Sequence, residues 1–402
     1  MYDIAIVGAG IVGLSTGMAL QEMFPDYKII VIDKEKEVAM HQTGHNSGVI
    51  HSGIYYKPGS LKARLAKKGN EEIVDFCVQY DIPYDRCGKV IIATEENELS
   101  RLQALYDRGI ENGLELRRLT ISELKEIEPH AVCLDAIHVP STGIVNFKLV
   151  AKTFARLIKK RNGDILLDAE VVDICEKPEW TEITTTKDKI KAKFVINCGG
   201  LLCDRIARKT NLVTGMKIVP FRGEYFKLVD EKKYLCKNLI YPVPNPDFPF
   251  LGVHFSRMMD GRVMIGPNAV LGLKREGYKK TDIHLGDLTE TLMYPGFWRV
   301  AGKNLKEGVK EIIRSMSKKV LVKELQRFIP EVKETDLLPA KAGVRAQALT
   351  RDGKLIDDFH MIHHKRMVHV LNAPSPAATA SIEIGRYIAQ EVSKVHRSIE
   401  FV

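Results

Sequence analysis

Residues 3–33 read DIAIVGAGIVGLSTGMALQEMFPDYKIIVID. A short apolar run is followed by three glycines spaced as G-x-G-x-x-G, by an apolar stretch that Pro25 ends, and by a second apolar run that leads to Asp33. This order predicts a strand, a helix and a second strand within about 30 residues. Such a unit is the βαβ core of a Rossmann-like nucleotide-binding domain.

The glycines of this motif have separate physical roles. Gly8 permits the tight turn after the strand, Gly10 lets the backbone approach a pyrophosphate, and Gly13 allows the helix to pack closely on the strand. The N–H groups at the start of the helix then point toward the phosphates. Asp33, twenty positions after Gly13, can accept hydrogen bonds from a ribose. The residues that we assign to this part of the cofactor site are Gly8, Gly10, Ile11, Val12, Gly13, Asp33 and Lys34.

A second glycine turn lies far along the chain, within residues 191–200 (KAKFVINCGG). An apolar strand ends there at Cys198, Gly199 and Gly200, and a helix is expected near Leu202. The first motif alone does not separate NAD from FAD. Two nucleotide-facing turns so far apart indicate an interleaved flavoprotein domain, because a simple NAD domain would end earlier in the chain.

Residues 368–380 (VHVLNAPSPAATA) predict a strand and the start of a helix that runs to about Val395. Ser375 is the expected N-cap and Pro376 the first helical residue. Small residues follow, and they let a flat ring lie close to the helix end, whose partial positive charge would stabilise an anionic reduced flavin. The residues expected at this helix end are Ser375, Pro376, Ala377, Ala378 and Thr379.

Between these segments the pattern changes to strand-like runs separated by turns, at residues 222–228, 250–255 and 262–265. An earlier insert, residues 88–143, is expected to join them. The predicted fold is α/β, α+β overall, with a Rossmann-like FAD-binding domain interleaved with a substrate domain on a mostly antiparallel sheet. The expected ranges are 1–87, 144–217 and 336–402 for the FAD-binding domain, and 88–143 and 218–335 for the substrate domain.

The chain has 402 residues and a formal net charge of +9. Basic residues are dispersed and no recognition motif accompanies them, so an acidic substrate, an anionic cofactor or a membrane surface is favoured over nucleic acid. Seven scattered cysteines without a C-x-x-C pair predict reduced thiols in a reducing compartment. No run approaches the roughly 18 apolar residues of a spanning helix. The expected location is the cytoplasm, with peripheral contact to the inner face of the plasma membrane as an alternative.

Residues 306–328 are basic and amphipathic, with four apolar side chains at helical spacing. Such a helix could lie on an anionic membrane. We expect instead a core-facing helix with a solvated lysine face. The apolar residues concerned are Val309, Ile312, Ile313 and Met316.

Residues 45–63 (HNSGVIHSGIYYKPGSLKA) resemble the L-2-hydroxyglutarate dehydrogenase/oxidase family, which belongs to the D-amino-acid-oxidase-like flavoproteins. The likeness spans nearly the whole chain and includes several long segments. These segments are residues 218–226 (IVPFRGEYF), 240–261 (IYPVPNPDFPFLGVHFSRMMDG), 342–349 (AGVRAQAL) and 372–381 (NAPSPAATAS).

The resemblance implies a noncovalently bound FAD, a 2-hydroxy dicarboxylate substrate, and oxidation of L-2-hydroxyglutarate to 2-oxoglutarate with electrons passed to membrane quinone or oxygen. Eukaryotic members carry a mitochondrial presequence, and the absence of one here favours a prokaryotic cytoplasm or inner membrane face. Further cofactor contacts that we assign on this basis are Ser47, Gly48, Val171, Gly343 and Arg345.

Oxidation of a 2-hydroxy acid needs a base that takes the hydroxyl proton, and histidine is the natural choice. The resemblance places His51 beside the flavin ring and His254 on a strand that covers it, and which of the two is the base stays open. No metal is expected, because no acidic or thiol ligand completes the group His360, His363 and His364.

Two substrate carboxylates call for planar guanidinium groups, which bind carboxylates through two hydrogen bonds. Arg222, Arg257 and Arg345 are therefore the leading anchors, and Arg345 could contact either the flavin or the substrate. Further substrate-binding candidates are Tyr55, Tyr56, Lys57 and Tyr241.

Three alternative functions stay open at this point. One is a flavin subunit that works mainly as a membrane-docked partner in a complex, which only the helix expected at residues 306–328 supports. Another member of the same superfamily, an amine or amino-acid oxidase or a glycerol-3-phosphate dehydrogenase, would differ in substrate profile. A nucleotide-binding or RNA-associated protein without redox activity is favoured only by the basic charge.

Overall fold

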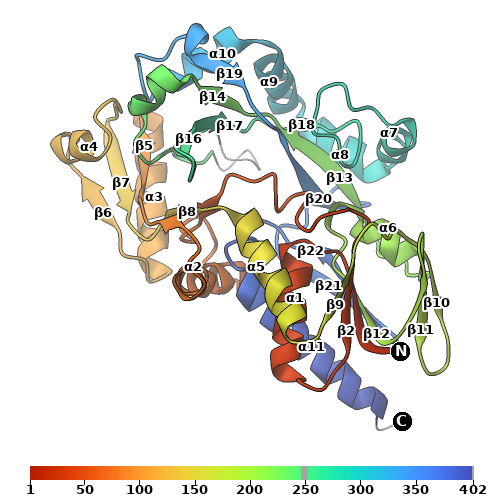
Figure 1. Cartoon of the computed structure of the whole chain (residues 1–402). Coiled ribbons are helices and arrows are strands. Elements are labelled where there is room, and N and C mark those ends of the chain that lie inside the picture. The colour runs from red at the N-terminus through yellow and green to blue at the C-terminus, as the bar shows by residue number, and fades with distance from the viewer. Residues whose placement is uncertain (246–251, 401–402) are drawn as a thin grey trace.

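The computed structural model describes residues 1–245 and 252–400, except for the side chains of residues 306, 307 and 395–400 (Figure 1). The strand expected at residues 250–255 therefore begins outside the described residues. None of the described helices is both long enough and apolar enough to cross a bilayer.

An eight-stranded sheet carries the glycine motif. Its central strands run parallel, because β1 pairs with β2 on one side and with β12 on the other, as the βαβ pattern predicts. On the edge of β12 that faces away from β1, the N-terminal half of the strand pairs with β11 and the C-terminal half pairs with β22. The strands are β10 (Val171–Glu176), β11 (Thr181–Thr185), β12 (Lys189–Asn197), β1 (Tyr2–Val7), β2 (Ile29–Ile32), β9 (Asp164–Leu166), β22 (Met367–Asn372) and β21 (His360–His364).

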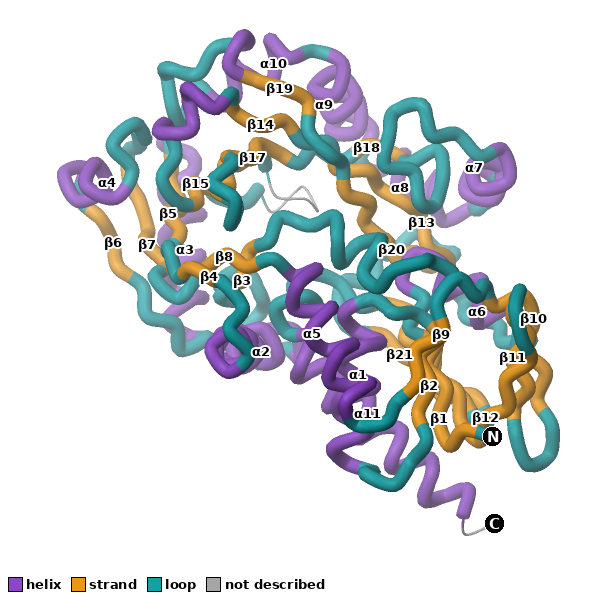
Figure 2. Tube along the Cα trace, viewed as in Figure 1, coloured by secondary structure: helices purple, strands orange, loops and turns teal. Residues whose placement is uncertain are grey.

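Helices cover one face of this sheet (Figures 1 and 2). The helix after the glycine motif is buried on almost all sides, because the sheet lies against one face and two other helices lie against the rest. The hairpin β10–β11 and the short helix α6 (Cys203–Arg208) contribute apolar residues to the core on the opposite face. The helices on the first face are α1 (Ile11–Met23), α5 (Phe147–Lys160), α11 (Ser381–Glu400) and, at its edge, α2 (Leu61–Gln79).

A second eight-stranded sheet lies beside the first. All its neighbouring strands are antiparallel except β15 and β5, so the mostly antiparallel sheet expected from the sequence is confirmed. In spatial order the strands are β19 (Leu337–Pro339), β14 (Phe226–Leu228), β17 (Val263–Gly266), β16 (His254–Arg257), β15 (Leu239–Pro242), β5 (Lys89–Ala93), β7 (Asp135–Val139) and β6 (Arg117–Leu119).

Two three-stranded sheets and six helices complete the described structure. The sheets are β18 (Val270–Leu271), β13 (Met216–Gly223) and β20 (Gly343–Thr350), and β3 (Val49–Ile50), β8 (Gly143–Val145) and β4 (Tyr84–Asp85). The helices are α3 (Glu96–Glu111), α4 (Ile121–Ile127), α7 (Leu285–Leu292), α8 (Pro295–Lys303), α9 (Leu305–Met316) and α10 (Lys318–Leu325).

We propose that the chain forms the two interleaved domains expected from the sequence, with one boundary changed. Strands of the first sheet come from residues 2–32, 164–197 and 360–372, which supports an interleaved domain. The strand β19 extends the second sheet to Pro339, so we propose that the chain returns to the first domain after that residue instead of at residue 336.

Two helix predictions were wrong. The C-terminal helix begins at Ser381, and residues 374–380 form turns, so Ser375 is not its N-cap and Pro376 is not its first residue. The single helix expected over residues 306–328 is two helices, because the chain leaves helical geometry at Ser317, which caps the second one. The apolar face of the first of these helices is exposed and does not face the core.

Candidate active site

A cavity of about 1640 Å³ extends from the carboxyl ends of β1, β2 and β12 to the second sheet. The carboxyl ends of parallel strands are where open α/β sheets bind their ligands. Small-molecule sites usually measure about 300–1,000 Å³. This cavity is therefore large enough for a dinucleotide together with a substrate.

The glycine turn forms one end of the cavity. Gly8 has a φ of +113°, which side chains rarely adopt, and a Cβ there would lie 2.8 Å from the carbonyl carbon of Cys198. A Cβ on Gly13 would overlap the carbonyl oxygen of Gly8, so this glycine supports the turn from behind and does not line the cavity. Asp33 does line it, and its carboxylate accepts the N–H of Ala9 at 2.6 Å. Burial raises the pKa of the Asp33 carboxyl above its usual value.

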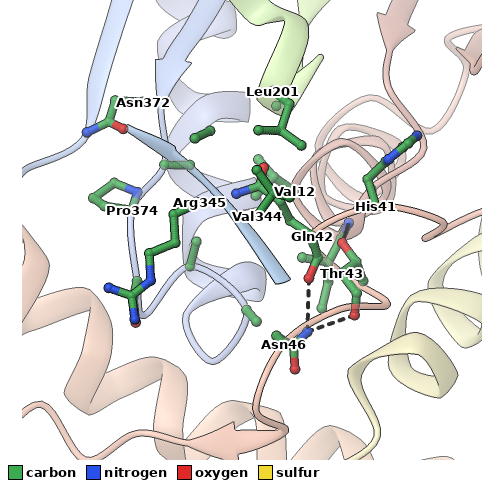
Figure 3. Close-up of a pocket in the computed structure, with 18 of the residues that line it drawn as sticks. Val12, His41, Gln42, Thr43, Asn46, Leu201, Val344, Arg345, Asn372 and Pro374 are labelled. Atoms are coloured by element: carbon green, nitrogen blue, oxygen red, sulfur yellow. Dashed lines mark hydrogen bonds between the residues drawn. The ribbon is translucent and has the colours of Figure 1, made fainter. Parts of the chain in front are cut away.

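The segment between Met40 and Ser47 was missed as a cofactor site, apart from Ser47 itself. Thr43 accepts the N–H of Ile11 at 3.0 Å, which fixes this segment to the first turn of α1. Asn46 donates to the carbonyl oxygens of Gln42 and Thr43, at 3.3 and 2.7 Å, and so holds the segment in a compact turn (Figure 3). The run of polar residues at positions 41–47 was the sequence feature that could have indicated this role. No local sequence pattern, however, shows that these residues pack against α1.

Residues 373–379 form a third wall of the cavity. Thr379 accepts the backbone N–H of His51 at 3.0 Å and donates to the carbonyl oxygen of Val49 at 3.3 Å. This pair of bonds joins the C-terminal turn to the segment that carries His51. The expected small residues are therefore at the cavity, although they belong to a turn and not to a helix end.

The end of the cavity near the second sheet gathers the expected reactive side chains. His254 stacks on Tyr241 with ring centroids 3.9 Å apart, and its Nδ1 lies 2.9 Å from the carbonyl oxygen of Gly252. Because that oxygen can only accept, Nδ1 carries the proton and Nε2 is left as an acceptor. Burial lowers the pKa of both His254 and His51 to about 3, so both rings are neutral at physiological pH.

Most of the predicted site residues line this one cavity. Among the catalytic and substrate candidates they are His51, Tyr55, Tyr56, Lys57, Tyr241, His254 and Arg345. Among the cofactor candidates they are Gly8, Gly10, Ile11, Val12, Asp33, Lys34, Ser47, Val171, Cys198, Gly199, Gly200, Gly343, Ser375, Pro376, Ala377, Ala378 and Thr379. Gly48, like Gly13, is absent from the lining.

Two of the three expected arginine anchors lie elsewhere. Arg222 is buried and donates to Glu224 at 2.9 Å and to the carbonyl oxygen of Lys279 at 3.2 Å. Arg257 forms an ion pair with Asp85. Neither lines the cavity, whereas the guanidinium of Arg345 does. The sequence did not reveal the two carboxylates that bind these arginines, so only Arg345 keeps its predicted position.

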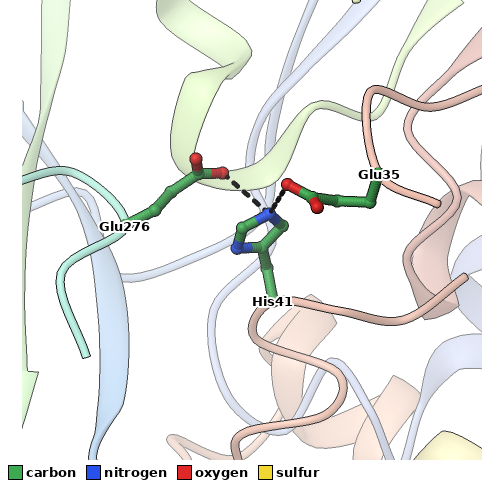
Figure 4. Close-up of side chains that lie close together, drawn as sticks. All are labelled: Glu35, His41 and Glu276. Carbon is green, nitrogen blue, oxygen red and sulfur yellow. Dashed lines mark hydrogen bonds and ion pairs between the residues drawn. The ribbon is translucent and has the colours of Figure 1, made fainter. Parts of the chain in front are cut away.

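Glu35, His41 and Glu276 are the one group of described residues whose possible metal ligands lie within 4.8 Å of one another (Figure 4). His41 Nε2 lies 2.9 Å from Glu35 and 3.1 Å from Glu276. The ammonium of Lys34 also pairs with both carboxylates, at 3.0 Å from Glu276. The lysine therefore balances the acidic charge, and the group is an ion-pair network that joins the segment after β2 to the segment before α7.

Comparison with known proteins agrees with this geometry. A family described as "FAD dependent oxidoreductase" matches residues 3–391. The L-2-hydroxyglutarate dehydrogenase of Indibacter alkaliphilus is 48% identical over 97% of this chain and 98% of its own, and that of Escherichia coli K12 is 46% identical over 98% and 93%. The FAD-bound L-alpha-glycerophosphate oxidase of Mycoplasma pneumoniae shares the fold, with a TM-score of 0.78 at 21% identity over 98% of this chain and 94% of its own. The chain therefore belongs to the FAD-dependent oxidoreductase family and, within it, to the L-2-hydroxyglutarate dehydrogenase family.

Proposed function

We propose that this protein oxidises L-2-hydroxyglutarate to 2-oxoglutarate with FAD as its cofactor. The observation that carries the proposal is 45–48% identity, over nearly the full length, to bacterial proteins named L-2-hydroxyglutarate dehydrogenase. The cavity supports it, because it combines a dinucleotide cradle with two neutral histidines and the half-buried Arg345.

The residues around the cavity fit FAD. At the glycine turn a Cβ on Gly8 would meet the carbonyl group of Cys198, so the tight turn requires glycine there, and its backbone can face a pyrophosphate. At the other end, the turn at residues 373–379 presents small side chains to a flat ring. When bound, FAD supplies the group that takes the hydride from C2 of the substrate. We propose that it is bound noncovalently by the cavity-lining residues named above.

His254 is the base that the geometry favours. Its Nδ1–H is directed to Gly252, so Nε2 is free to accept the hydroxyl proton as the hydride leaves C2. Stacking on Tyr241 fixes the plane of the ring. His51 lies nearby, and we propose that it orients the substrate, together with Tyr56 and Lys57, without taking its proton.

The test is an anaerobic absorbance spectrum of the FAD-loaded protein before and after L-2-hydroxyglutarate is added. We expect rapid bleaching of the flavin band by the L form alone, because the bound substrate presents one face of C2 to the flavin. The D form, glycerol 3-phosphate and sarcosine are parallel controls. Bleaching by one of these instead would show that the cofactor is right and the substrate wrong.

We further propose that membrane quinone takes the electrons and that the protein docks peripherally on an anionic membrane through the α7–α9 surface. We define this surface by the exposed apolar side chains on or beside three successive helices, of which α8 contacts both α7 and α9. Figure 1 shows where these helices lie. Exposed apolar patches with basic neighbours are typical of interfacial helices, and Lys303 and Lys310 are exposed beside this one. Its apolar members are Leu285, Met293, Trp298, Leu305, Val309, Ile312, Ile313 and Met316.

Replacing Ile312 with glutamate should lower binding to vesicles of phosphatidylcholine and phosphatidylglycerol by about tenfold, because a charge on the inserted face opposes its burial. Co-sedimentation of the holoprotein measures this binding. Val78→Glu is the matched control, since Val78 is 61% exposed on α2, away from this surface. Equal binding by both variants would contradict the docking surface and leave the oxidation of L-2-hydroxyglutarate untouched.

A further inference from the structure

The substrate of the proposed function is a dianion, yet only one of the expected guanidinium anchors is at the cavity. Arg222 and Arg257 are held by Glu224 and Asp85. Arg345 lines the cavity from β20. A monocarboxylate could be held by one such group, but selection of a five-carbon diacid needs a second positive or hydrogen-bond-donating group for the other carboxylate.

Lys89, the first residue of β5, is a buried cation that the sequence did not single out. Its side chain is among the largest fully buried ones, with 1% exposure. Its ammonium lies 3.3 Å from the hydroxyl oxygen of Tyr55, and it lies over the rings of Tyr55 and Tyr241 at 4.5 and 4.9 Å from their centroids. No carboxylate among the described residues pairs with it, and no nearby charge offsets the effect of its burial.

A buried ammonium without an anion is costly, and proteins usually avoid it. Burial lowers the pKa of Lys89 to about 7, which holds the amine near the point at which it loses its proton. An anion that enters the site would reverse this effect, because an opposite charge favours the protonated form. A buried ammonium in this setting is therefore well suited to an anionic ligand.

Lys89 is close to the reacting end of the cavity. Its positive charge contributes to the lowered pKa of both His51 and His254. Tyr55, Tyr241 and both histidines line the cavity, and Lys89 lies directly behind the two tyrosines. Since an ammonium group cannot accept a hydrogen bond, it donates to the Tyr55 oxygen, and the Tyr55 O–H is left to point elsewhere.

We propose that Lys89 and Tyr55 together form the subsite for one carboxylate of the substrate, with the ammonium orienting the Tyr55 hydroxyl and supplying the positive charge behind it. Lys89 is then a positioning residue that selects 2-hydroxy diacids over 2-hydroxy monoacids of the same length. The inference rests on the proposed function, because it assigns a subsite for that substrate.

The test compares holoenzyme variants on L-2-hydroxyglutarate and on L-2-hydroxypentanoate, which replaces the distal carboxylate with a methyl group. Lys89→Met should raise KM for the diacid about 100-fold and change kcat little. The reason is that the bound substrate loses the buried positive charge that interacts with its carboxylate. For the monoacid, KM and kcat should each change less than about threefold. Lys89→Arg should recover at least part of the loss, and Lys67→Met, which removes an exposed lysine of α2, should leave the diacid preference unchanged.

A second readout does not depend on turnover. Titration of the flavin spectrum with 2-oxoglutarate and with 2-oxopentanoate should show a preference for the diacid that Lys89→Met and Tyr55→Phe both remove. Flavin content and melting temperature report whether each variant folds. A diacid preference that survives in a folded Lys89→Met protein, or an equal loss for both ligands, would overturn the subsite. If L-2-hydroxyglutarate fails to bleach the unmodified enzyme, the proposed function fails instead, and the two titrations still decide whether Lys89 recognises a second carboxylate.

Discussion

Replacing His254 with glutamine should slow the reduction of the bound flavin by L-2-hydroxyglutarate about 10²–10⁴-fold, the usual contribution of a general base. The imidazole Nε2 is the acceptor that the hydrogen bond to Gly252 leaves unprotonated, and an amide at this position cannot take the proton. Stopped-flow absorbance under anaerobic conditions measures the rate. Flavin content should be unchanged, because His254 lies on a strand of the second sheet, remote from the glycine turn.

The same experiment separates the two histidines and gives a pH dependence. The His51→Gln substitution should slow flavin reduction clearly less than His254→Gln does. The reverse order would identify His51 as the base. Burial holds the pKa of His254 at about 3. A base acts when deprotonated, so this residue is active above that pKa, and kcat/KM should not fall between pH 8 and about pH 5 on its account. If the base had the ordinary histidine pKa, kcat/KM would fall to half its maximum at about pH 6.5.

Replacing Gly8 with alanine should abolish FAD binding, with less than about a tenth of the flavin of the unmodified protein retained. Gly8 adopts a φ of +113°, which costs a residue with a Cβ about 1–3 kcal/mol, and the new methyl group would meet the carbonyl of Cys198. Movement of either strand end would open the cradle that faces the pyrophosphate. The ratio of flavin absorbance to protein absorbance after purification measures the effect.

Gly215→Ala is the matched control for this variant. Gly215 also has a positive φ, +68°, but no atom lies within 4 Å of the position of its Cβ. It therefore carries the backbone strain without the clash at the cradle. Equal flavin content in Gly8→Ala and Gly215→Ala would show that the turn at Gly8 is not the FAD cradle.

The βαβ unit, the second glycine turn and the mostly antiparallel second sheet could be predicted from the residues alone, and the cofactor and the family from the resemblance. These features are encoded in short stretches, because the period of apolar residues and the placement of glycine act over a few positions. For the same reason β1, α1 and β2 follow one another in the predicted order within the first 32 residues.

Which charged and polar groups contact one another could not be predicted from the residues and is seen only in the folded chain. The helix start expected at Ser375 moved to Ser381, where the preceding turn is bonded to His51, more than 300 positions earlier. Arg257, which was expected to bind the substrate, pairs with Asp85, and Lys89, which the sequence did not single out, is buried beside Tyr55 and Tyr241. The interaction energy of a charge depends on its distance from other charges and on its burial, and folding sets both through contacts between remote segments.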